Sequence, residues 1–224
     1  MCGRFVQRYT WDDIQDLYDL PDGPARNLQT HYNVAPTDPV NVVRLATGGA
    51  TELVSIRWGL IPWWWKKPLK QMPASFNARA ETVADKPMFR DAFQRHRCVI
   101  PASGYYEWLK MPDGRQPYFI SAVDGGVLSF AGVWDRWKNP ETGEPVISCT
   151  IIVTDANALT RRIHDRMPVV LDKADIRRWL SGEGGTELLK PAADDRLRMW
   201  PVSRRVNKTG AGDDDPTLLD EVAA

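Results

Sequence analysis

The spacing of apolar and polar residues changes several times along the 224-residue chain, and these changes predict short elements of both kinds. In the segment 10–20, TWDDIQDLYDL, apolar residues recur at helical spacing after Thr10, a suitable N-cap. The segment 86–97 reads as a second short helix with Pro87 near its first turn, and 172–182 as a third that Gly182 ends. The pattern therefore predicts only a few short helices.

The remaining stretches are rich in β-branched and aromatic residues and are separated by turn sequences. Residues 40–58 contain two such runs around Gly48 and Gly49, which is a hairpin signal. Further runs lie at 97–110, 116–123, 127–137, 146–154 and 197–203. Strands that are close in sequence and joined by tight turns favour antiparallel pairing. We therefore expect one mostly-β domain of the α+β class over residues 1–207, followed by a flexible tail at 208–224.

Charge and cysteine content narrow the classes of function. Lys plus Arg and Asp plus Glu both number 29, so any nucleic-acid contact must come from a local patch rather than from overall charge. No apolar run is long enough to span a bilayer and no signal peptide is evident, so we expect a cytoplasmic protein. Three scattered cysteines form neither a disulfide framework nor a zinc motif, and we expect no metal and no cofactor. Cys98 and Cys149 lie in strand-like runs and are interpreted as buried hydrophobic residues.

The first residues, MCGRF, offer a specific chemistry. Removal of Met1 would leave Cys2 with an amine and a thiol on adjacent carbons. The amine has a reference pKa of about 7.7–8.0 and the thiol of about 8.5, so both are partly nucleophilic near neutral pH. Such a pair condenses with an aldehyde to an imine and then closes a thiazolidine ring. From these residues alone, a cysteine that follows the initiator by chance is the favoured interpretation.

Asn77, Arg79 and Glu81 alternate in the segment SFNARAET, so on a strand they share one face. Asn77 offers a hydrogen-bond donor and an acceptor, and Arg79 offers a guanidinium fork that suits phosphate. A solvated strand face is the alternative.

Two further residues are candidates for proton transfer. Glu107 lies between Tyr106 and Trp108 in an apolar run, where partial burial would raise its pKa into the range used in acid–base catalysis. His164 stands beside a carboxylate and an arginine just before another strand-like run, and histidine is the commonest general acid–base residue. An outward-facing Glu107 and a His164 in a structural turn remain the alternatives.

Ordered motifs cover most of residues 1–207: MCGRF, YNVAPT, RWGLIPWW, FNARAET, MFRDAFQRHRCVIPASGYYEW, PYFI, FAGVWD, TIIVTDAN, IHDRMPVVL and PVSRRVN. Together they resemble the SRAP family, the abasic-site processing proteins also called SOS-response-associated peptidases. The resemblance implies a single SRAP-type domain. It also implies an activity that captures abasic sites, preferentially in single-stranded DNA near replication forks, as a covalent protein–DNA crosslink. We expect such a protein to act as a monomer and to associate with the nucleoid when it engages DNA.

The resemblance also assigns roles to individual residues. It implies that Cys2 is the nucleophile after autocatalytic removal of Met1, forming a Schiff base and then a thiazolidine with the opened sugar. Asn77 would position the amine or the sugar, and Glu107 and His164 would transfer protons. The Schiff base further implies a slow strand-cleaving lyase side activity.

For DNA binding, the resemblance points to arginines that meet phosphates and to aromatic residues that contact the lesion. The arginines are Arg4, Arg79 and Arg166; the aromatic residues are Trp64 and Trp65 as a base-stacking wedge and Trp108 against the sugar. The chain departs from the family pattern in the segment 68–74, PLKQMPA, which is longer than in short bacterial members. That insertion leaves open which of Trp63, Trp64 and Trp65 is the wedge.

Three other functions compete with this hypothesis. N-terminal-nucleophile amidohydrolases, such as glutamine amidotransferase domains, also begin Met-Cys-Gly and use a processed Cys2, but they attack an amide and need an oxyanion hole. A general cysteine peptidase would act mainly on protein. A DNA-binding module without chemistry would make the grouping of Cys2, Asn77, Glu107 and His164 a coincidence.

Overall fold

The computed structural model describes residues 2–210 and 213–223, which form twelve strands and three α-helices. The strands are β1 (Phe5–Gln7), β2 (His31–Val34), β3 (Pro39–Leu45), β4 (Thr51–Trp58), β5 (Asn77–Arg79), β6 (Arg97–Ala102), β7 (Gly104–Met111), β8 (Gly114–Ala122), β9 (Leu128–Lys138), β10 (Pro145–Asp155), β11 (Arg166–Pro168) and β12 (Leu197–Pro201). The helices are α1 (Trp11–Tyr18), α2 (Arg90–Arg95) and α3 (Lys173–Ser181). The expected α+β class with mostly β structure is confirmed.

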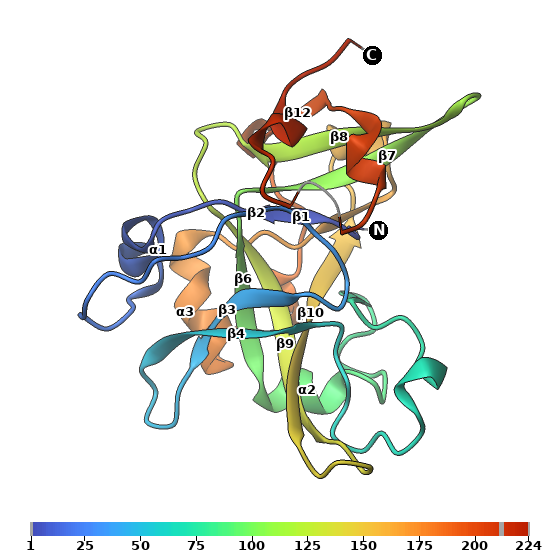
Figure 1. The fold of residues 1–224 in the computed structure, drawn as a ribbon. Coiled ribbons are helices and arrows are strands. Elements are labelled where there is room, and N and C mark those ends of the chain that lie inside the picture. Colours follow the sequence, from blue (N-terminus) through green and yellow to red (C-terminus); the bar gives the residue numbers. More distant parts are fainter. Residues whose placement is uncertain (1, 211–212, 224) are drawn as a thin grey trace.

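The larger sheet has the strand order β11-β10-β4-β3-β6-β9, and β9 also pairs with β10. That additional pairing closes β10, β4, β3, β6 and β9 into a barrel, which removes the exposed edges that an open sheet would present. Most pairs are antiparallel, as expected, but β4 and β5 both run parallel to β10. Figure 1 shows β10 running through the molecule, with its arrowhead beside the N-terminus.

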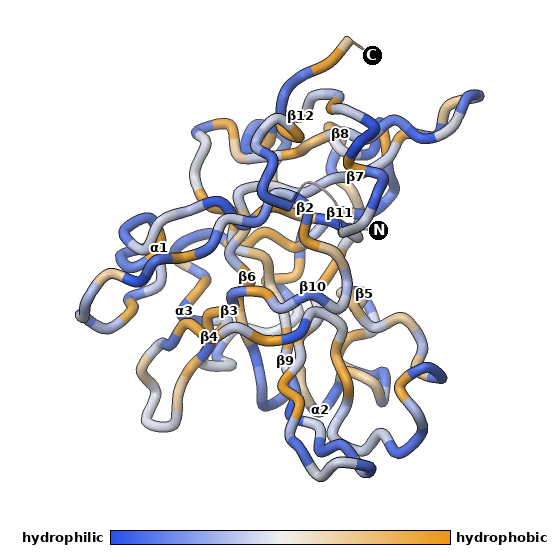
Figure 2. The backbone as a smooth tube through the Cα atoms, viewed as in Figure 1, coloured by the Kyte–Doolittle hydropathy of each residue, from blue (hydrophilic) through white to orange (hydrophobic). Residues whose placement is uncertain are grey.

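The second sheet is antiparallel in the order β12-β8-β7-β1-β2 and packs on the barrel. One buried cluster joins β1, β7 and β8 to the barrel strands and contains Cys2, Phe5 and Tyr105. Another joins the barrel to α1 and α3 through residues such as Ile14 and Trp179. Figure 2 shows hydrophobic stretches along the central strands and hydrophilic ones in the outer loops. The first cluster places the N-terminal residues in the core between the two sheets.

Local signals explain the helices. Thr10 and Asp13 form a reciprocal capping box at the start of α1, as the sequence predicts for Thr10. Gly182 ends α3 with a φ of 83°, a left-handed conformation that glycine adopts readily. The helix expected at 86–97 is shorter, because turns occupy the residues before Arg90. Among the described residues, no helix has the length and apolar character needed to cross a membrane.

The described part of the segment expected to be loose makes defined contacts. Asp213 accepts a hydrogen bond from the backbone N–H of Tyr32 at 2.7 Å, Leu218 is buried, and Glu221 bridges to Val202. Residues 211, 212 and 224 lie outside the described residues. Figure 1 shows this segment lying over β7, β8 and β12. The residues at 213–223 therefore cover the second sheet, and the flexibility expected for the tail stays a prediction.

Gly104, which opens β7 opposite Val6 of β1, has no room for a side chain. A Cβ there would lie 2.3 Å from Phe119 Cζ and 2.5 Å from the Ile120 carbonyl oxygen. We expect Gly104→Ala to lower the free energy of unfolding in urea by about 1–3 kcal/mol, because backbone and ring must both shift. Gly23→Ala is the matched control, since nothing lies within 4 Å of its added carbon. Equal losses in the two variants would contradict this explanation.

Candidate active site

Cys2 lies in the core at the entrance to β1. Its side chain is fully buried, and the thiol faces the Arg4 carbonyl oxygen at 3.8 Å. Burial raises the pKa of the Cys2 thiol well above its usual value, and the nearby Glu107 carboxylate raises it further. Met1 lies outside the described residues, so its predicted removal is not seen here. Because its pKa is raised, the buried Cys2 thiol is protonated near neutral pH, and its reaction as a nucleophile needs a proton acceptor.

Asn77 fixes the backbone of Cys2. It begins β5, whose parallel pairing with β10 sets it opposite Ile151. Its Nδ2 donates to the Cys2 carbonyl oxygen at 2.7 Å. Its Oδ1 is buried and has no hydrogen-bond partner among the described residues. A buried amide oxygen without a partner is costly, so Asn77 holds an acceptor ready beside Cys2.

Glu107 lies on β7, two residues after Tyr105, and is only 2% exposed. Burial raises the pKa of its carboxyl to about 7, and the Asp165 carboxylate contributes in the same direction. Glu107 acts electrostatically on the Cys2 thiol, so the two groups are neighbours. A carboxyl with a pKa near neutrality can both accept and return a proton under physiological conditions.

His164 lies in the turn that leads into β11. Its Nδ1 is 3.0 Å from the backbone nitrogen of Arg166 and 3.0 Å from Asp165 Oδ1. Burial lowers the pKa of His164, which favours the neutral ring. A neutral ring that accepts the Arg166 N–H at Nδ1 carries its proton on Nε2. The interaction of Asp165 with Glu107 places this turn beside the Glu107 carboxyl, so the two predicted proton-transfer residues belong to one site.

The three predicted phosphate-binding arginines have different environments. Arg4 is only 8% exposed, and its guanidinium donates to Asn33 Oδ1 at 2.7 Å and to the Val206 carbonyl oxygen at 2.8 Å. Arg166 pairs with carboxylates on the protein, Glu81 and Asp155. Arg79 ends β5 and is exposed. Of the three, Arg79 has the guanidinium most open to a phosphate.

Trp108 lines an open cavity next to Cys2. The cavity has a volume of about 520 Å³, and its walls come from Gly3, Arg4, Pro36, Phe76, Trp108, Arg115, Asn207 and Thr209. Trp108 Nε1 donates to Asn207 Oδ1 at 2.6 Å. Gly3 and Arg4 line the cavity, so it lies beside the two residues that directly follow Cys2 in the chain.

The tryptophan run Trp63–Trp65 is held by the turn before α2 and by β9. Trp64 Nε1 donates to the Pro87 carbonyl oxygen at 3.3 Å, and the Trp65 carbonyl accepts from Trp137 Nε1 at 2.6 Å. Trp63 is 59% exposed, whereas Trp64 and Trp65 are half-buried. By exposure alone, Trp63 presents the largest open ring of the three.

This run lies away from Cys2. Trp137 pairs with Val146 on β10, five residues before Ile151, which pairs with Asn77. Five residues of strand span roughly 16 Å. In Figure 1, α2 lies at the opposite end of β10 from the N-terminus. The structure therefore groups Cys2, Asn77, Glu107, His164 and Trp108, and sets the tryptophan run apart; a wedge role for Trp64 and Trp65 stays a prediction.

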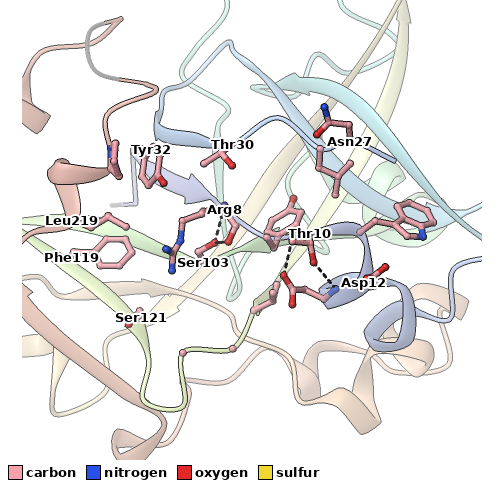
Figure 3. Close-up of a pocket in the computed structure, with 18 of the residues that line it drawn as sticks. Arg8, Thr10, Asp12, Asn27, Thr30, Tyr32, Ser103, Phe119, Ser121 and Leu219 are labelled. Atoms are coloured by element: carbon pink, nitrogen blue, oxygen red, sulfur yellow. Dashed lines mark hydrogen bonds between the residues drawn. The ribbon is translucent and has the colours of Figure 1, made fainter. Parts of the chain in front are cut away.

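A second cavity, of about 1020 Å³, lies at the other end of β1 and is shown in Figure 3. Arg8 lies in it, and the Arg8 backbone exchanges hydrogen bonds with the Ser103 hydroxyl. Phe119 and Tyr32 form part of the wall. Its described lining residues include no cysteine or histidine. The smaller cavity has none among its described lining residues either, but it lies beside Gly3, the residue that follows Cys2.

Sequence reasoning missed two residues of this site. Tyr105 is fully buried in the same cluster as Cys2, and its hydroxyl has no hydrogen-bond partner among the described residues. Tyr105 and Glu107 are two residues apart, and such residues share one face of a strand, so the sequence could have indicated that Tyr105 lies on the same face as Glu107. Asn207 reaches Trp108 from the C-terminal segment, and only the tertiary fold brings these residues together.

The arrangement offers a thiol and proton-transfer groups that suit reaction with a carbonyl compound. Within residues 2–210 and 213–223, no group of three or more His, Cys, Asp or Glu side chains could hold a metal ion. The site instead combines a buried thiol, a carboxyl with a pKa near neutrality, a neutral imidazole and an amide acceptor.

The chain belongs to the SRAP family, described as SOS response associated peptidase, whose family model matches residues 1–209. Among curated relatives, it is 37% identical to abasic site processing protein YoqW of Bacillus subtilis over 214 residues, which is 92% of this chain and 94% of the relative. It is 33% identical to abasic site processing protein YedK of Escherichia coli, covering 92% and 94% of the two chains.

The similarity extends to a eukaryotic relative and to solved structures. Abasic site processing protein HMCES of Xenopus tropicalis is 31% identical over 93% of this chain and 75% of its own length. The crystal structure of a Bacteroides thetaiotaomicron protein superposes with a TM-score of 0.87 at 26% identity, covering 99% of this chain and all of that one.

Proposed function

We propose that this protein senses abasic sites in single-stranded DNA and captures them as a covalent thiazolidine crosslink at Cys2. The observation that carries the proposal is the position of Cys2: its carbonyl is held by Asn77, and its thiol neighbours a carboxyl with a pKa of about 7. The family and the printed names of the relatives support the choice of abasic DNA as substrate.

The chemistry begins with hydrolysis of the Met1–Cys2 bond, which frees the Cys2 amine. The amine adds to the aldehyde of the opened sugar and loses water to form a Schiff base. The Cys2 thiol then gives its proton to Glu107, and its sulfur bonds to the imine carbon while the C=N electrons return to nitrogen. Glu107 passes the proton on to that nitrogen and is ionised again. The net reaction joins aldehyde and aminothiol and releases one water.

Asn77 and His164 complete this reaction. Asn77 Oδ1 accepts a hydrogen bond from the Cys2 amine, while Nδ2 keeps hold of the Cys2 carbonyl. His164 donates a proton from Nε2 to the hydroxyl of the amine–aldehyde adduct, which leaves as water when the Schiff base forms. The same Schiff base permits β-elimination, which would give a slow lyase activity. The protein acts as a monomer in the cytoplasm and on DNA exposed near replication forks.

DNA is held by a few contacts rather than by overall charge. Arg79 binds a phosphate, Trp108 packs against the lesion sugar, and the tryptophan run stacks on bases farther along the strand, where each stacked base contributes about 1–3 kcal/mol. Arg4 and Arg166 act mainly through the protein, because both already bind partners within it.

We expect Arg79→Ala to weaken binding of single-stranded DNA several-fold at low salt and progressively less as salt increases. Without one phosphate contact, binding releases about one counterion fewer from the DNA. The slope of the logarithm of the binding constant against the logarithm of the salt concentration therefore becomes shallower by about 0.7. Fluorescence anisotropy across a salt series measures this slope. Arg178→Ala on α3, whose guanidinium pairs with Asp175, is the control. A loss of affinity that is equal at every salt concentration would contradict a phosphate contact.

The function is tested with two matched oligonucleotides, one intact and one carrying a single abasic site. After incubation, we expect a heat-stable shifted band on a denaturing gel only with the abasic strand. Intact mass should show a protein that lacks one methionine, and the conjugate should equal protein plus DNA minus one water. Equal retention of both strands without a covalent product would indicate a binding module instead.

An N-terminal-nucleophile amidohydrolase is the second candidate, since the motif Met-Cys-Gly and a buried Cys2 fit it too. That reaction would release ammonia from glutamine and leave no DNA conjugate. A glutaminase assay on the same preparation separates the two functions.

A further inference from the structure

Tyr105 presents an unsatisfied buried hydroxyl inside the Cys2 site. Its side chain is fully buried, its ring packs edge-on to Phe130 at 5.9 Å, and its hydroxyl has no hydrogen-bond partner among the described residues. Tyr105 pairs with Phe5 in the β1–β7 register, and Phe5 is three residues after Cys2 in the chain. Tyr105 also belongs to the cluster that contains the Cys2 side chain. A phenol is rarely buried without a partner, because its desolvation is not repaid by a hydrogen bond.

The contacts of Cys2 change when its thiol loses a proton. In the structure the S–H faces the Arg4 carbonyl oxygen, which can only accept a hydrogen bond. A thiolate has no proton to donate and is repelled by that oxygen, so it must turn toward a donor. Asn77 Nδ2 is already bound to the Cys2 carbonyl. The Tyr105 hydroxyl is the unengaged donor in the same cluster.

We propose that Tyr105 donates a hydrogen bond to the Cys2 thiolate when it forms, and thereby sets how readily Cys2 reacts. This inference rests on the proposed function for its use in DNA capture. The phenol stays a donor throughout, because burial raises the pKa of Tyr105 well above its usual value, with Cys2 and Glu107 adding to the effect. The titratable groups that act here are Cys2, Tyr105 and Glu107, with Asp165 acting on Glu107 and the Cys2 amine joining them after Met1 is removed.

The test is Tyr105→Phe, which removes only the hydroxyl. We expect the midpoint of Cys2 alkylation by iodoacetamide to move upward by about one pH unit, with a rate about tenfold lower near neutral pH, because a hydrogen bond to a charged group is lost. Mass spectrometry of the Cys2 peptide reports the site, and thiolate ultraviolet absorbance gives a second titration that needs no reagent access. Thermal stability should stay equal or rise, since a buried unpaired hydroxyl is removed.

Tyr106→Phe is the matched control. The Tyr106 hydroxyl donates to the Tyr32 carbonyl oxygen at 2.8 Å, and its side chain belongs to the separate cluster on the other face of the sheet. This variant should lose stability but leave the Cys2 titration unchanged. An unchanged titration in Tyr105→Phe would overturn the inference. Because neither readout involves DNA, wild-type protein that fails to crosslink abasic DNA would refute the proposed function without deciding the role of Tyr105.

Discussion

Replacing Cys2 by serine is expected to reduce the heat-stable conjugate with abasic single-stranded DNA by at least about a hundredfold. The serine amine can still form a Schiff base, but a hydroxyl is a far weaker nucleophile than a thiol at neutral pH. The product therefore stays at the reversible imine stage. Borohydride reduction should convert that imine to a stable amine link and restore a shifted band. The measurement is a time course on denaturing gels with and without borohydride.

Cys149→Ala is the control for this experiment. Cys149 is as fully buried as Cys2 and belongs to the same cluster, but it lies on β10 rather than at the chain start. It should lose some stability and keep the crosslink. Melting temperatures of both variants separate unfolding from lost chemistry. A durable conjugate in folded Cys2→Ser without borohydride would exclude a thiazolidine.

Much of the fold follows from local signals. The capping box at Thr10, the turn at Gly48 and Gly49, and the glycine after α3 each determine backbone conformation within a few residues. Barrel closure and the parallel pairing of β4 and β5 with β10 do not follow from such signals. Those pairs join strands far apart in the chain, and nothing within either strand specifies its partner.

The candidate site shows the same division. Residue type and neighbours left open whether Glu107 is partly buried with a raised pKa or faces outward; the structure buries it, and burial raises its pKa to about 7. For Arg4, the family resemblance implied a phosphate contact, and the structure buries its side chain against Asn33 and Val206. Val206 comes from the segment next to the predicted tail, more than two hundred residues away in the chain. A guanidinium suits a carbonyl cluster as well as a phosphate, so sequence alone cannot distinguish the two uses.

Glu107→Gln is expected to slow crosslinking about a hundredfold at neutral pH, within the range of general acid–base catalysis. In the wild type the rate should rise with pH through about 7, the pKa of the buried carboxyl, because only the ionised form accepts the thiol proton. Glutamine cannot accept that proton, so the inflection should disappear. Crosslinking rates across a pH series measure both effects. Glu141→Gln, an exposed residue in the turn between β9 and β10, should keep the wild-type profile.

The same carboxyl makes stability depend on pH, with a sign that the folded pKa determines. Below about pH 4.5, Glu107 is protonated in both the folded and the unfolded states. Between about pH 4.5 and 7 it is ionised in the unfolded chain but still protonated in the folded protein. The free energy of unfolding of the wild type therefore falls as pH rises through this interval, by up to about 3 kcal/mol. Glu107→Gln lacks this loss. The melting temperature of the variant should therefore rise relative to that of the wild type between about pH 4.5 and 7, and the difference should stay constant above about pH 7. A constant difference between the two proteins from acid to neutral pH would mean that the folded pKa of Glu107 is not raised, and would contradict its role as a base with a pKa near neutrality.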